Sequence, residues 1–172
     1  MKKIMVAMMA VLILTTGCSK KEESNQDTNV KTNESIGKKE VKGTLTFMDT
    51  DITPGKSFNE KSIASIPEKS ELPSCALEGM DHVYKYEDLE ITANVKDGKE
   101  IIYSVYFITE NVTTPEGVKI GDSKTKLLET YGSDFQDDVS LITYTSDNGK
   151  VKLNFQIEND TVSGIEYAQV LK

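Results

Sequence analysis

The chain has 172 residues and a formal net charge of −8, and it contains neither tryptophan nor arginine. Arginine supplies the forked guanidinium that binds phosphate with two hydrogen bonds, and an acidic chain is repelled by polyanions, so we expect no nucleic-acid partner. With one histidine and two cysteines in the chain, a zinc site of the cysteine and histidine type falls short on ligands, and we expect no metal and no cofactor.

Residues 1–17 have the plan of a secretory signal. Lys2 and Lys3 form a positive start, and the apolar run from Ile4 to Leu14 follows. This run is about half of the ~20 residues that a membrane-spanning helix needs. The small residues TTG then lead directly to Cys18. The pattern predicts export of the chain.

The stretch LTTGC at 14–18 resembles the lipobox of bacterial lipoproteins, with Thr15 at the place where that motif usually has leucine. The resemblance implies that the thiol of Cys18 carries a diacylglycerol, that the signal is cut just before Cys18, and that the lipid holds the protein on the outer side of the bacterial cell membrane. The alternatives are a cleaved signal with a free Cys18 and an uncleaved anchor.

Residues 18–42 are rich in Lys, Glu, Asn, Ser and Thr. Too little apolar surface is present to offset the ordering entropy, which predicts a disordered tether.

Residues 43–172 have the composition of one globular domain. Apolar and polar residues alternate over 44–48, 89–95 and 151–157. Period two with one polar face predicts an antiparallel sheet that is open to water on one side. Asp97-Gly98 and the Asp-Asn-Gly run at 147–149 predict hairpin turns.

Two short helices are expected between the strands. The first begins with the capping-box pattern Ser57-Phe58-Asn59-Glu60 and stops at Pro67. The second begins after Asp122 or Ser123 and ends at Gly132. Similar elements recur about 62 residues apart, which suggests two halves of about 43–112 and 113–172. Each half would be a helix followed by three strands. The predicted fold class is therefore α+β, with short helices packed on one face of a largely antiparallel sheet.

The stretches 73–91 and 113–132 carry a resemblance to a known group. They look like uncharacterised envelope lipoproteins of clostridia and related Firmicutes, whose architecture is similar to the tandem fold of beta-lactamase inhibitory protein and to SmpA/OmlA-type lipoproteins. The resemblance implies a non-catalytic scaffold whose exposed sheet face binds another protein. The chain lacks the inhibitor's disulfide in each half, so inhibition of a beta-lactamase is not expected.

The run IIYSVYFI at 101–108 is apolar on both faces. If Ile101, Tyr103, Val105 and Phe107 point inward, then Ile102, Tyr106 and Ile108 point outward. Alternation in the neighbouring strands turns Asn94 and Asn154 outward as well. Exposed apolar groups on a polar face are typical of interaction sites, so Ile102, Tyr106, Asn94 and Asn154 form the predicted binding surface. The alternatives are a loop or the tether that covers this strand, or a reversed parity with Tyr103 outside.

The candidate nucleophiles are few. Cys75 precedes His82 by seven residues, and Ser123-Lys-Thr-Lys126 matches the Ser-x-x-Lys pattern of penicillin-binding enzymes. We expect Cys75 to be a small buried hydrophobic residue and Ser123 to be a helix cap. The predicted function is thus that of a lipid-anchored, non-catalytic module for protein binding or envelope assembly. The alternative is a small extracytoplasmic enzyme that uses Cys75 with His82 or Ser123 with Lys126.

Overall fold

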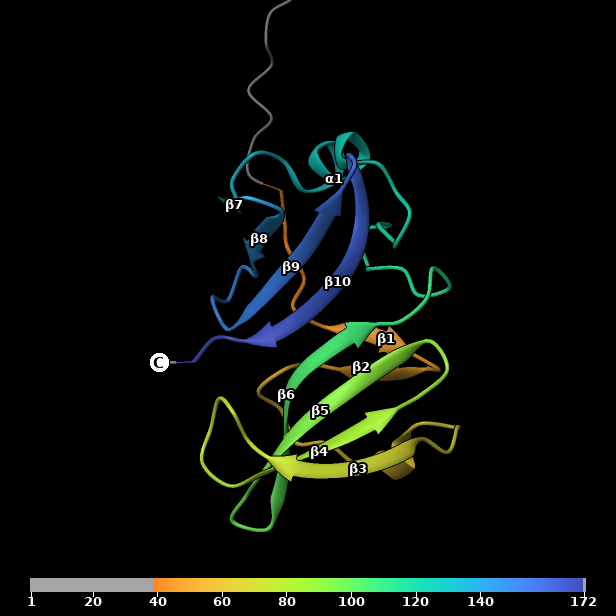
Figure 1. Cartoon of the computed structure of the whole chain (residues 1–172), viewed down its shortest axis with the longest axis vertical. Coiled ribbons are helices and arrows are strands. Elements are labelled where there is room, and N and C mark those ends of the chain that lie inside the picture. Colours follow the sequence, from red (N-terminus) through yellow and green to blue (C-terminus); the bar gives the residue numbers. More distant parts are fainter. Residues whose placement is uncertain (1–38, 172) are drawn as a thin grey trace, which may run out of the picture. The chain divides into compact units, whose positions relative to one another are not determined.

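The computed structural model describes residues 39–171 of the chain (Figure 1). The expected signal segment, Cys18 and most of the expected tether lie outside the described residues. No helix within 39–171 has the length and apolar character to cross a membrane.

Eight strands form one antiparallel sheet with the order β3-β4-β5-β6-β10-β9-β8-β7. Two meanders, β3 to β6 and β7 to β10, meet where β6 pairs with β10, and Tyr106 lies opposite Glu166 there (Figure 1). The strands are β3 (Glu68–Pro73), β4 (Met80–Lys85), β5 (Leu89–Lys96), β6 (Lys99–Phe107), β7 (Gln136–Asp138), β8 (Leu141–Thr145), β9 (Val151–Glu158) and β10 (Thr161–Gln169).

One face of this sheet, called the inner face here, carries the core. The alternation predicted for 89–95 and 151–157 is confirmed, since Leu89, Ile91 and Leu153 are fully buried on this face. A two-stranded hairpin of β1 (Leu45–Phe47) and β2 (Thr50–Ile52) contributes buried side chains to the same core. Aromatic rings fill much of the space, and Tyr144 contacts Phe155 edge to face.

The expected second helix is confirmed as α1 (Lys124–Tyr131). The Ser123 side chain accepts a hydrogen bond from the backbone N–H of Lys126, and the helix stops at Gly132, whose φ is 84°. A positive φ is strained for most residues and easy for glycine. Leu127 and Tyr131 are buried and attach this helix to the core.

The expected first helix is wrong. Only the 3₁₀ turn η1 (Glu60–Ser62), capped by Asn59, occurs there. The preceding backbone is pulled against β6 instead: Gly55 N–H donates to the Ile102 carbonyl (2.7 Å), and Phe58 N–H donates to the Glu100 carbonyl (2.8 Å). These long-range bonds hold the segment against β6 in a non-helical conformation and override its local capping signal.

The fold class also needs correction. The described chain is largely β, with one α-helix, rather than α+β with helices packed on a sheet face. Each half has four strands in the sheet instead of three, and only the second half begins with an α-helix.

The packed region includes residues that precede Gly43. Val41 is buried, its N–H donates to Oδ2 of Asp147 (3.2 Å), and its carbonyl accepts from Asp147 N–H. Lys42 N–H donates to Oε1 of Glu116. The end of the stretch expected to be a tether therefore packs on the second half.

Candidate functional site

The face of the sheet opposite the core, called the outer face here, carries a continuous cross-strand row. Strand register places one residue from each strand directly beside the next. We call these residues the Tyr106 row: Gln136, Thr143, Asn154, Glu166, Tyr106, Glu90, Lys85 and Glu68. It crosses both halves and is polar apart from its one aromatic ring.

Tyr106 occupies the centre of this row, at the seam between the halves. Its side chain is 41% exposed, while its neighbours Val105 and Phe107 are fully buried. Glu90 and Glu166 lie directly opposite it on the two flanking strands. The outward orientation expected for Tyr106 is confirmed, and its two carboxylate neighbours are an addition that sequence reasoning missed. Their proximity depends on strand register, for which the sequence carries no local signal.

Asn154 belongs to the same row and is half-buried. Its amide nitrogen donates to Oε2 of Glu166 (2.9 Å), and its amide oxygen accepts from the Thr143 hydroxyl (2.9 Å). This chain of bonds fixes the Glu166 carboxylate beside Tyr106.

Ile102 does not lie on the outer face, so its expected orientation is wrong. A β-bulge occurs in β6, because Thr92 pairs with Ser104 while Ala93 pairs with Ile102, leaving Tyr103 as the extra residue. The bulge shifts the parity of the strand and places Ile102 in the core, 2% exposed. It falls where β6 changes partner along one edge, from β10 to the segment 55–58.

Asn94 points to the outer face but is only 4% exposed. Its amide nitrogen donates to Oδ1 of Asp81 (2.9 Å) and contacts the carbonyls of Glu78 (3.2 Å) and Met80. These bonds tie the β3–β4 loop to β5. Asn94 is thus a structural group under this loop, and the exposure expected for it is wrong.

A second polar cluster lies on the inner face near β3. Nδ1 of His82 is 2.5 Å from Oε1 of Glu100, and Nε2 is 3.4 Å from the Glu71 carboxylate. The Tyr84 hydroxyl donates to the same Glu100 carboxylate at 2.7 Å. Burial raises the pKa of Glu100, but the bonds from Tyr84 and His82 outweigh it and hold that pKa below its ordinary value. Burial, followed by the bond to Glu100, raises the pKa of Tyr84.

This arrangement bears on the Cys75–His82 pair. Both ring nitrogens of His82 face carboxylates, so neither is directed to a thiol. Cys75 is free and exposed in the loop between β3 and β4, so its expected burial is wrong. The loop that holds Cys75 lies at the end of a hairpin whose edge strand is itself exposed.

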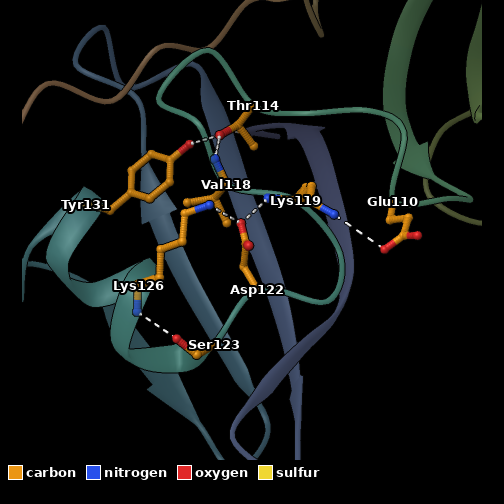
Figure 2. A network of polar contacts seen from close by, with 8 residues as sticks. All are labelled: Glu110, Thr114, Val118, Lys119, Asp122, Ser123, Lys126 and Tyr131. Atoms are coloured by element: carbon orange, nitrogen blue, oxygen red, sulfur yellow. Dashed lines mark hydrogen bonds and ion pairs between the residues drawn. The ribbon is translucent and has the colours of Figure 1, made fainter.

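The Ser123–Lys126 pair is also not arranged as nucleophile and base. Ser123 Oγ accepts from the backbone N–H of Lys126 (3.1 Å), whereas Nζ of Lys126 reaches Oδ2 of Asp122 (2.7 Å; Figure 2). The same carboxylate accepts from Lys119 N–H. The expectation that Ser123 is a helix cap is confirmed.

Within 39–171, no group of three or more His, Cys, Asp or Glu side chains is arranged to hold a metal ion. No protein-family model matches the chain. No curated protein matches it either, so the resemblance to clostridial lipoproteins stays a prediction. Among solved structures, the uncharacterised protein yfeY from Escherichia coli is similar at 15% identity and a TM-score of 0.47, over 76% of this chain and 100% of that one. This similarity is too low to assign a fold family or a function.

Proposed function

We propose that this protein is an extracytoplasmic lipoprotein, anchored through Cys18, that binds a basic segment of another envelope protein on its outer sheet face. The observation that carries the proposal is the half-exposed Tyr106 between the Glu90 and Glu166 carboxylates. Tyrosine is enriched among binding anchors because a rigid ring gives a large contact area and its hydroxyl can still hydrogen-bond.

The charge of this surface favours a basic partner. The Tyr106 row holds Glu68, Glu90 and Glu166 against a single cation, Lys85. Complementary charge steers association and selects against like-charged partners. A lysine- or arginine-containing segment laid across β5, β6 and β10 would pair with Glu90 and Glu166 while its apolar atoms cover the Tyr106 ring.

The anchor restricts where this binding takes place. The LTTGC motif, which supports lipid on Cys18, precedes the packed region that begins near Val41. The domain would therefore be held close to the bilayer, which raises its effective concentration for partners at the same surface.

Site-specific photo-crosslinking tests the binding proposal. A photoreactive residue replaces Tyr106 in the full chain, expressed in the native host, and the same residue replaces Leu171 as a control of similar exposure (43%). We expect a discrete adduct from position 106. Its yield should fall at least about three-fold when Glu90→Gln and Glu166→Gln are combined, because charges at the rim of an interface mainly raise the association rate. Raising the salt concentration should lower it as well.

Lys85→Gln is the matched control, since it removes a cation from the same row. It should leave the yield unchanged or raise it. Equal adducts from positions 106 and 171, or a yield that is insensitive to both the glutamate changes and salt, would contradict the proposal.

A further inference from the structure

Within 39–171, the sheet ends in two edge strands, β3 and β7, which differ in length and sequence. β7 is three residues long and ends with Asp137 and Asp138. β3 has six residues, all of them exposed. Its backbone pairs with β4 along one side only, since β3 is the terminal strand of the sheet (Figure 1). An edge of this kind is a template for another strand unless something blocks it.

Register shows which backbone groups of β3 face outward. Ser74 N–H donates to the Gly79 carbonyl, and the pairing from Glu68 to Pro73 contains no bulge. Since bonded residues alternate in an antiparallel ladder, Glu68, Ser70 and Leu72 bond to β4. The backbone N–H and C=O groups of Lys69 and Glu71 therefore point away from the sheet.

The two prolines follow the same alternation as Lys69 and Glu71. Pro67 precedes β3 and Pro73 ends it, and the backbone of both faces the open edge of β3, where proline has no N–H to donate. Between them lie four outward hydrogen-bonding groups, the N–H and C=O of Lys69 and of Glu71. The run P-E-K-S-E-L-P at 67–73 is thus symmetric in its hydrogen-bonding groups about Ser70.

We propose that β3 pairs antiparallel with β3 of a second copy of this chain, across a two-fold axis through Ser70. In this register Lys69 lies opposite Glu71 of the second copy, and Glu71 lies opposite its Lys69. All four outward backbone groups of each copy are then bonded. Pro67 falls opposite Pro73 of the second copy, so the ladder ends at each side with no N–H left unpaired.

Charge complementarity selects a second copy as the occupant. The Lys69 and Glu71 side chains lie near Glu100 (3.8 Å) and His82 (3.4 Å) of their own chain but remain 38% and 57% exposed, so both can also reach across the new edge. The symmetric pairing brings opposite charges together twice, and opposite-charge pairs stabilise facing strands. The same operation on β7 would place Asp137 against itself, which disfavours that edge.

A disulfide test reads the register directly. In the proposed pairing the two Ser70 residues form a pair that is not hydrogen-bonded, with Cα atoms about 4.5 Å apart, within the range that a disulfide spans. The full chain with Cys75→Ser as background receives either Ser70→Cys or Glu68→Cys, and mild oxidation is followed by a non-reducing gel. Both positions are exposed on the same strand.

We expect a covalent dimer from Ser70→Cys and none above background from Glu68→Cys. The two position-68 residues would be offset by four residues along the strands, about 14 Å. The Cys75→Ser parent sets the background from Cys18. No dimer from Ser70→Cys would overturn the proposal. Equal dimer from both variants would overturn it too, because it indicates random collision.

Exchanging the charges of Lys69 and Glu71 tests whether a second copy of the chain pairs with β3. Lys69→Glu converts both cross-copy pairs to repulsive ones, so the Ser70→Cys dimer yield should fall at least about five-fold, and adding Glu71→Lys should restore it to within about two-fold. Lys152→Glu makes the same charge change on β9 and should have no effect. A yield that is unaffected by Lys69→Glu, or is not restored by the exchange, would overturn the pairing. Circular dichroism of each variant confirms that the fold is intact.

Discussion

Tyr106 and Gly164 fit against each other across the seam between β6 and β10. A Cβ atom on residue 164 would lie 3.0 Å from the Tyr106 hydroxyl oxygen, closer than such contacts normally come. The absence of a side chain at Gly164 gives the phenol room to lie along the outer face while its ring stays partly exposed. The ring is therefore positioned by the sheet surface and not by the core.

Because of this position, we expect that Tyr106 can be replaced with little effect on the stability of the fold. Tyr106→Ala should change the free energy of unfolding by less than about 1 kcal/mol, as exposed substitutions usually do. Tyr167→Ala on the adjacent strand removes a fully buried ring and should cost about 3–5 kcal/mol. Urea unfolding followed by circular dichroism measures both. A large loss in the Tyr106 variant would assign this ring to the core.

The thiol of Cys75 should react readily in the native protein. Because Cys75 is exposed in the β3–β4 loop, a thiol reagent at neutral pH should label it at a rate within about three-fold of the rate in denaturant. Cys75→Ser should abolish the fast labelling. A native rate many-fold slower than the denatured rate would mean that the loop shields this thiol.

Lipid on Cys18 can be tested by labelling and fractionation. Cys18→Ala should remove labelled fatty acid from the protein and leave the signal uncut at this site, since the modified thiol precedes cleavage in the lipobox scheme. Thr15→Leu, which restores the usual lipobox residue, should keep both lipid and cleavage. Mass spectrometry that finds a mature chain with an unmodified Cys18 would contradict the anchor.

Acid should weaken the fold partly through Glu100. Its pKa is held below the ordinary value of 4.5, so the folded state favours the charged form. The stabilisation is complete above the ordinary pKa and is lost as pH falls through the lower pKa of the folded state. Asp88 and Asp122 also have lowered pKa values and contribute with the same sign.

Comparison with Glu100→Gln isolates the part of the acid destabilisation that is due to Glu100. Between about pH 5 and pH 3, the free energy of unfolding of Glu100→Gln should fall less steeply than that of the unchanged protein. Glu158→Gln, at an exposed position on β9, should follow the unchanged protein. Equal slopes for Glu100→Gln and the unchanged protein would show that the Tyr84–Glu100–His82 contacts do not favour the charged carboxylate.

Several short-range patterns in the sequence predicted the structure correctly, although the capping box at 57–60 did not. The Asp97-Gly98 turn joins β5 to β6, with φ values of 52° and 70° that Asp and Gly adopt more readily than most residues. Ser123 and Gly132 bound α1 as their cap chemistry predicts. Alternation located β5 and β9 and assigned their inner faces correctly. Each of these signals depends on neighbours within a few residues.

The sequence by itself thus determined the turns and the helix that Ser123 caps, whereas for Tyr106 it offered the outward direction with the reversed parity still open. Only the tertiary structure decided that 55–58 is bonded to β6 instead of leading into a helix, that Ile102 is buried and that Cys75 is exposed. Backbone bonds between 55–58 and β6 cancel a helix that local capping favoured, and the bulge at Tyr103 reverses the parity of half a strand. Both follow from which distant segment supplies hydrogen bonds to one edge of β6, and a single strand's residue pattern does not encode its partners.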